Sequence, residues 1–118
     1  MPPKPNGGVE CIIERAGDGR YYPKKGETIA VHYVGTLDNG KVFDSSYSRG
    51  RPFRFKVGVG QVVPGWDEAV KQLSVGEKAR CIVPADLAYG NKGIPGLIPP
   101  GATLYLEIEL ISIVTSAI

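Results

Sequence analysis

The chain has 118 residues, of which 42% are hydrophobic and 22% charged, and its formal net charge is +2. This composition is typical of one globular domain with a packed core, and it excludes a disordered polar chain. Basic residues never form a run of five, and no stretch approaches the roughly 20 apolar residues of a membrane span, so we expect neither nucleic acid nor a membrane as a partner.

The first eight residues, MPPKPNGG, contain no apolar stretch of the kind that secretory signals carry. We therefore expect residues 1–8 to form a flexible lead-in and residues 9–118 to form a single domain. The same reasoning predicts a cytoplasmic protein, and the single-domain length favours a monomer.

Alternating apolar and polar residues predict that most of the chain is β-strand. In residues 27–36 this pattern places Ile29 and Tyr33 on the same face. Asn39-Gly40 then predicts a tight hairpin turn, because such turns need residues that accept a positive φ. The predicted strands are 9–14, 27–36, 41–44, 53–57, 77–83 and 102–114.

Residues 65–73 carry the pattern of the one clear helix. Its apolar residues recur at the spacing i, i+3, i+4 and i+7, at Trp66, Ala69, Val70 and Leu73. Together with the strands, this predicts an α+β fold in which a curved antiparallel sheet wraps around one short amphipathic helix. A Gly/Pro-rich loop is expected over residues 90–101.

Residues for covalent or metal catalysis are poorly represented. His32 is the sole histidine, and Cys11 and Cys81 lie in separate apolar strands, which is too few ligands for a zinc site. Residues 35–42 resemble a phosphate-binding loop, but they lack its Ser/Thr and are better explained by the hairpin. We therefore expect no cofactor and no metal, and a function based on binding.

The aromatic residues are the most informative remaining feature. Tyr33, Phe43, Phe53 and Phe55 lie on neighbouring predicted strands, and Trp66 is the first apolar residue of the helix. Such rings are compatible with an ordinary core or with an aromatic binding pocket. Asp44, directly after Phe43, fits either the end of a strand or a carboxylate in that pocket.

Three segments carry a resemblance to a known family. They are VHYVGTLDNGKVFDSS (31–46), GQVVPGWDEAV (60–70) and AYGNKGIPGLIPPGATL (88–104). In this order they resemble the FKBP-type peptidyl-prolyl cis–trans isomerases, and the likeness extends from about residue 9 to 114. It implies a five- to six-stranded antiparallel half-barrel around the helix, with a ligand pocket between helix and sheet.

The resemblance also implies site residues. The catalytic positions would be Tyr33, Phe43, Asp44, Trp66 and Tyr89. Trp66 would form the pocket floor beneath the proline ring, and the Tyr89 hydroxyl and the Val63 N–H would hold ligand carbonyls. The ligand-binding positions would be Tyr33, Phe43, Asp44, Arg49, Phe53, Gln61, Val62, Val63, Trp66, Tyr89, Ile94, Leu97, Ile98 and Leu106.

Three positions depart from the family pattern as it stands in well-known members. Leu106 replaces a pocket phenylalanine, Ile94 replaces a histidine, and Gln61 replaces an acidic residue. We expect activity to survive with an altered sequence preference. Tyr105 should point to the opposite face of its strand from Leu106, because side chains alternate.

Three functional hypotheses remain open at this stage. The first is an isomerase acting on proline-containing peptides and binding tacrolimus and rapamycin, whose drug complexes would capture calcineurin or the target-of-rapamycin kinase. The second is a ligand-gated docking module with little turnover. The third is redox control through Cys11 and Cys81, because the family fold implies that their strands are neighbours.

Overall fold

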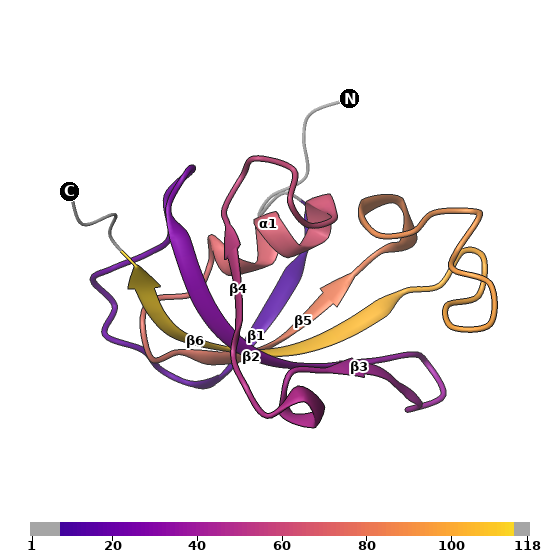
Figure 1. The fold of residues 1–118 in the computed structure, drawn as a ribbon, viewed down its shortest axis with the longest axis horizontal. Helices are drawn as coiled ribbons and strands as arrows, with labels where there is room; N and C mark the ends of the chain where they lie inside the picture. The colour runs from indigo at the N-terminus through magenta and orange to yellow at the C-terminus, as the bar shows by residue number, and fades with distance from the viewer. Residues whose placement is uncertain (1–7, 115–118) are drawn as a thin grey trace.

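The computed structural model describes residues 8–114, which form a six-stranded antiparallel sheet and one short α-helix (Figure 1). The sheet order is β1-β5-β6-β2-β3, and β4 also pairs with β2. This confirms the α+β fold expected from the sequence. The elements in chain order are β1 (Glu10–Arg15), β2 (Thr28–Thr36), β3 (Val42–Ser45), η2 (Tyr47–Arg49), β4 (Phe53–Lys56), α1 (Pro64–Val70), β5 (Lys78–Val83), η3 (Ala85–Leu87) and β6 (Leu104–Val114).

Strand β2 is the centre of the sheet. Along one edge it pairs with β6 over its whole length, from Thr28 to Thr36. Its other edge is shared, because β4 pairs with residues 28–31 and β3 pairs with residues 34–36. The change of partner occurs at His32 and Tyr33, and this is where the candidate site begins.

Strand β6 confirms the alternation predicted from its sequence. Leu104, Leu106, Ile108 and Leu110 are each at most 1% exposed, whereas the intervening residues are half-buried. The buried side chains belong to the same core cluster as those of α1. The helix lies over one face of the sheet (Figure 1). Burial of this stripe against the helix supplies the core, since removing apolar surface from water is the main favourable term in folding.

The helix α1 is shorter than expected but buries the predicted stripe. Trp66 is 9% exposed, and Ala69, Val70 and Leu73 are fully buried. Regular helix ends at Val70 because the amides that follow bond to carbonyls three residues back: the Gln72 N–H donates to the Ala69 carbonyl and the Leu73 N–H to the Val70 carbonyl, each at 3.1 Å. Helix and sheet approach closely at Gly65, where a Cβ atom would lie 2.2 Å from Val83 Cγ1.

The predicted flexible lead-in over 1–8 lies outside the described residues, except for Gly8. The radius of gyration, 13.9 Å, is that of a compact chain of this length. Within residues 8–114 no helix has the length and apolar character required to cross a membrane.

Candidate active site

A cavity of about 480 Å³ opens between the sheet and α1. Its walls come from β2, β3, β4, the segment that leads into α1, the helix itself and the segment after η3. The lining residues are Tyr33, Asp44, Phe53, Gly60, Gln61, Val62, Val63, Trp66 and Tyr89. All but Gly60 were named as candidate site residues from the sequence, and the fold brings them together from segments far apart in the chain.

The floor of the cavity is a cluster of perpendicular aromatic rings. The Trp66 ring lies 4.8 Å from Tyr33 and 6.0 Å from Phe53, with interplanar angles of 87° and 72°. Phe55 packs against it from the core side at 5.8 Å and is only 3% exposed. Edge-to-face pairs of this kind are stabilising and fix ring orientation. The aromatic residues therefore serve as both core and binding surface, and Trp66 belongs to both.

A polar cluster lies at one side of this floor. The Tyr33 hydroxyl donates to Asp44 Oδ2 at 2.5 Å, and Arg49 Nη1 donates to Asp44 Oδ1 at 2.7 Å. Arg49 Nη2 also donates to the Tyr33 hydroxyl at 2.6 Å. Each of the three side chains therefore bonds to the other two, which fixes the Asp44 carboxylate at the cavity wall. Arg49, named from the sequence as a ligand-binding position, contacts Asp44 and is not itself part of the cavity lining.

This cluster keeps its charges fixed over a wide pH range. Burial favours the neutral form of Asp44, but the hydrogen bonds from Tyr33 and Arg49 outweigh it and hold the pKa of this carboxyl below its ordinary value. Burial and the neighbouring carboxylate raise the pKa of Tyr33 above its ordinary value. Asp44 is thus an anion and Tyr33 a neutral donor at physiological pH, and neither is poised for proton transfer.

Ser46 anchors Tyr33 and was not singled out from the sequence. Its hydroxyl accepts from the Tyr33 N–H at 2.8 Å and lies 2.8 Å from His32 Nδ1, while the Ser46 N–H donates to the Tyr33 carbonyl at 3.0 Å. These bonds replace the strand ladder where β2 changes partner. His32 lies at the same edge of β2 and also stacks on Tyr47, with ring centroids 4.5 Å apart. The only sequence signal for Ser46 is its place after a strand-ending aspartate.

The rim of the cavity, residues 57–63, is held by two side chains. Asp67 Oδ1 accepts from the Gly58 N–H at 2.7 Å, and Gln61 Oε1 accepts from the Lys56 N–H at 2.8 Å. Asp67 was overlooked in the sequence, although an acidic residue in the first turn of a helix is a common capping signal. Gly60, which lines the cavity, takes a φ of 80°, a conformation that favours glycine.

Two donors at the cavity remain available to a ligand. Among residues 8–114, neither the Val63 N–H nor the Tyr89 hydroxyl has a hydrogen-bond acceptor. Tyr89 is 36% exposed, so its hydroxyl is accessible. These are the two groups that the family resemblance assigns to ligand carbonyls.

Phe43 and Leu106 do not line the cavity. The Phe43 ring packs on Gly35, where a Cβ atom would lie 2.5 Å from its Cζ atom. Leu106 is 1% exposed and belongs to the core beneath the sheet surface. Their contacts with a ligand stay a prediction, because neither residue is part of the cavity lining.

The loop residues Ile94, Leu97 and Ile98 also lie outside the cavity. Ile94 and Ile98 bond to each other through two backbone hydrogen bonds of 2.8 Å, which close a tight loop. Leu97 is 41% exposed, whereas Ile98 is 3% exposed and packs into the core. Leu97 and Ile98 line a separate hollow of about 470 Å³ beside the 37–41 hairpin.

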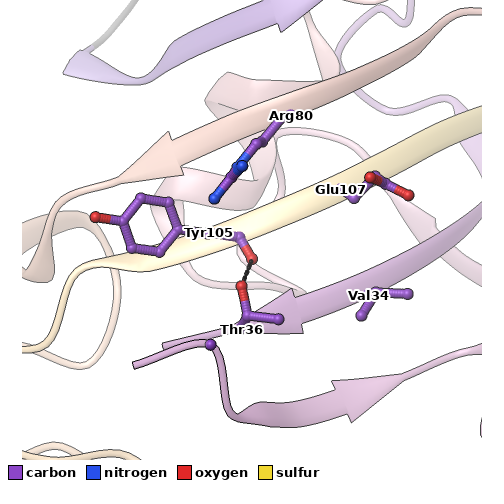
Figure 2. A pocket seen from close by; sticks show the side chains of 6 residues that line it. Val34, Thr36, Arg80, Tyr105 and Glu107 are labelled. Carbon is purple, nitrogen blue, oxygen red and sulfur yellow. Dashed lines mark hydrogen bonds between the residues drawn. The ribbon is translucent and has the colours of Figure 1, made fainter. Parts of the chain in front are cut away.

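A further hollow, of about 350 Å³, lies on the opposite face of the sheet (Figure 2). Tyr105 lines it beside Arg80, whose guanidinium lies 5.4 Å from the ring centroid, and Thr36 Oγ1 donates to the Tyr105 carbonyl. The prediction that Tyr105 faces away from Leu106 is therefore confirmed. Of the described residues that line this hollow, Tyr105 is the one aromatic residue, whereas Tyr33, Phe53, Trp66 and Tyr89 line the cavity beside α1. No group of three metal-ligating side chains occurs within the part of the chain that the structure describes.

Comparison with known proteins gives a consistent result. Residues 19–111 match the model of the FKBP-type peptidyl-prolyl cis-trans isomerase family. The chain is 52% identical over 107 residues to FK506-binding protein 1 of Candida glabrata, which covers 91% of this chain and 94% of that protein. It is 51% identical over 106 residues to peptidyl-prolyl cis-trans isomerase Fkbp12 of Drosophila melanogaster, covering 90% and 98% respectively. The crystal structure of AtFKBP13 superposes with a TM-score of 0.84 at 40% identity, covering 93% of this chain and 95% of that one.

Proposed function

The chain belongs to the family of FKBP-type peptidyl-prolyl cis–trans isomerases, and we propose that its aromatic cavity is where an X–Pro bond is bound and rotated. The observation that carries this assignment is the geometry around Trp66: an apolar floor of perpendicular rings beside a charge-fixed polar cluster and two free donors. A proline ring is flat and apolar enough to rest on the Trp66 indole. Its flanking carbonyls are the acceptors that the Val63 N–H and the Tyr89 hydroxyl require.

The chemistry needs no acid, base, nucleophile or metal. Rotation about X–Pro passes through a twisted amide against a barrier of roughly 18–20 kcal/mol, because resonance is lost. The planar amide is more dipolar than the twisted one, so moving it from water into an apolar cavity disfavours the ground state more than the transition state. A thousandfold acceleration requires only about 4 kcal/mol. Desolvation on Trp66 and one or two hydrogen bonds to the twisted conformer are of this size.

Each polar group then has an orienting role. The Tyr33–Asp44–Arg49 cluster keeps a fixed negative charge at the cavity wall and holds the Tyr33 ring against Trp66. The Tyr89 hydroxyl and the Val63 N–H fix the substrate carbonyls on either side of the rotating bond. An apolar residue before proline is favoured, because Leu97 is exposed and Ile94 is half-buried in the loop that follows Tyr89.

The same cavity is proposed to receive the macrolides tacrolimus (FK506) and rapamycin. Support comes from the relatives named FK506-binding protein 1, which share about half of their residues with this chain. Capture of calcineurin or of the target-of-rapamycin kinase by the drug complex is part of this proposal, as are a monomeric state and a cytoplasmic location. Pull-down in the presence of drug tests the capture of a partner, and size-exclusion chromatography tests the monomeric state.

A docking module with little turnover is not favoured. The matched family is described by its isomerase activity, and one relative of 51% identity carries that activity in its name. The feature that suggested docking, Leu106 in place of a ring, lies in the core rather than in the cavity. Its effect on turnover is therefore indirect.

The deciding experiment follows isomerisation of a tetrapeptide with Leu before Pro, with and without tacrolimus. Acceleration that disappears at near-stoichiometric drug supports both the activity and the site. A second arm compares Tyr89→Phe with Tyr105→Phe, a tyrosine on the opposite face. Loss of one hydrogen bond of about 1 kcal/mol should weaken drug binding by roughly fivefold in the first variant only. Absence of acceleration, with the drug still quenching Trp66 fluorescence, would instead support the docking module.

A further inference from the structure

Two cysteines face each other across the outermost pair of strands. Cys11 of β1 and Cys81 of β5 are direct partners in the antiparallel register. Directly opposed side chains share a face of the sheet, with Cβ atoms about 4.5–5.5 Å apart, and a disulfide requires about 3.5–4.5 Å. The Cys11 thiol donates to the Ala69 carbonyl at 3.9 Å, and neither cysteine is in a disulfide. Only a small movement therefore separates them from bonding distance.

The pair differs in access to reagents. Cys81 is fully buried in the core, whereas Cys11 is half-buried on β1, a strand whose remaining residues are exposed. Strand β1 is at the edge of the sheet and pairs with β5 alone. The hydrogen bond with Cys11, and then burial, raise the pKa of the Cys81 thiol. Reagents in solution therefore reach Cys11 first, and Cys81 is the group positioned to react with it afterwards.

We propose that Cys11 and Cys81 form a reversible intramolecular disulfide that locks the edge strand β1 onto β5. A low-molecular-weight disulfide such as oxidised glutathione supplies the oxidant. The Cys11 thiolate attacks it and releases one reduced glutathione, and the Cys81 thiolate then attacks the Cys11 sulfur and releases the second. The two protons lost by the cysteine thiols pass through solvent to the two released glutathione thiolates, and the two electrons reduce the glutathione disulfide to two thiols.

The consequence is local to the edge of the sheet. Besides its ladder to β5, β1 is held by Gln72 Nε2, which donates to the Val9 carbonyl at 2.8 Å, and by Arg15, which pairs with Glu109 at 2.6 Å. The new bond closes a loop of about 70 residues, and such a cross-link stabilises mainly by restricting the unfolded chain. Neither cysteine lines the aromatic cavity, so turnover is expected to stay unchanged.

The test uses the wild-type chain, reduced or treated with oxidised glutathione at about pH 8, where a thiol of ordinary pKa begins to ionise. After alkylation, trypsin separates the cysteines into peptides 1–15 and 81–92. We expect these two peptides to be joined within a monomer, the chain to be lighter by two hydrogen atoms, and the melting temperature to rise by roughly 10 °C. Dithiothreitol should reverse all three changes.

The matched control is Cys11→Ser, which leaves Cys81 buried and without a partner. It should show no cross-link and no rise in melting temperature under the same treatment. Two alkylated thiols in the treated wild-type chain would overturn the proposal. So would a stable glutathione adduct on Cys11 alone, or a disulfide between two copies of the chain.

Discussion

Replacing Tyr33 by Phe removes one oxygen atom from the centre of the polar cluster. The ring should keep its edge contacts with Trp66 and Phe53, because these involve carbon atoms only. What is lost is the hydrogen bond to Asp44 at 2.5 Å and the one from Arg49 at 2.6 Å. Asp44 and Arg49 keep their own 2.7 Å ion pair.

The expected loss of stability follows from the exposure of these partners. A hydrogen bond to a charged group contributes about 1.5–3 kcal/mol when it is shielded from water. The side chains of Arg49 and Asp44 are 43% and 41% exposed, so water can replace the lost hydroxyl and each bond is worth much less. Two bonds of about 0.5–1 kcal/mol each predict a total loss of about 1–2 kcal/mol.

Urea denaturation followed by the fluorescence of Trp66, the sole tryptophan, measures this loss. Tyr47→Phe is the matched control, because Tyr47 is 51% exposed and the phenylalanine ring would keep the stack on His32. The unfolding free energy of this variant should fall by less than about 0.5 kcal/mol. A loss of more than about 3 kcal/mol for Tyr33→Phe would show that the cluster is shielded from water. Equal losses in the two variants would show that the hydrogen bonds of the Tyr33 hydroxyl contribute nothing to stability. Either result would refute the reasoning.

Four further predictions concern the cavity and its supports. The pKa of Asp44 is lower in the folded state than its ordinary value near 4, so ionised Asp44 stabilises the fold fully above that pH and this stabilisation is lost as the pH falls further. Asp44→Asn should therefore flatten part of the acid side of a plot of unfolding free energy against pH. An unchanged acid side would contradict this. Between about pH 5 and 8 the kcat/KM of the wild-type enzyme should be constant, and a bell-shaped profile would instead indicate acid–base catalysis. Gly35→Ala should push the Phe43 ring aside and destabilise the fold by about 1–3 kcal/mol in a thermal melt. Gly35 does not have a positive φ, so a loss below about 0.5 kcal/mol would rule out the steric explanation. Asp67→Asn should weaken the hydrogen bond to the Gly58 N–H, lower the affinity for tacrolimus by a few-fold in a fluorescence titration, and lower the unfolding free energy by only about 1 kcal/mol. Unchanged affinity would show that drug binding does not depend on this hydrogen bond at the rim.

The sequence predicts the framework of this fold well because periodicity reports directly on burial. The period-2 pattern of 102–114 and the helical spacing from Trp66 to Leu73 each identify the buried face correctly. The end of the helix was missed by three residues, since the stripe continues through turns that are not α-helical. Periodicity cannot distinguish these two backbones when the same side chains are buried.

The candidate site was predicted less evenly, and the reason is physical. Trp66, Tyr33 and Asp44 could be named because their side chains themselves form the cavity. Ser46 and Asp67 act by bonding to backbone amides, and neither residue type is distinctive at its position. The placement of Phe43 on Gly35 depends on the register of β2 and β3, which residue pattern alone does not specify.

The shared edge of β2 has a consequence for how this enzyme can vary. Because β4 and β3 occupy separate stretches of that edge, residues 46–52 cross between them without belonging to any ladder. This crossing supplies Arg49, which bonds to Tyr33 and Asp44 of the cavity wall, and Ser46, which bonds to the backbone of Tyr33. Exchanging its outer residues would therefore alter the substrate-facing charge while every strand pairing stays intact. Selectivity can in this way change through residues that lie outside every strand ladder, and the loss of stability is limited to the exposed bonds that Arg49 makes to Asp44 and Tyr33.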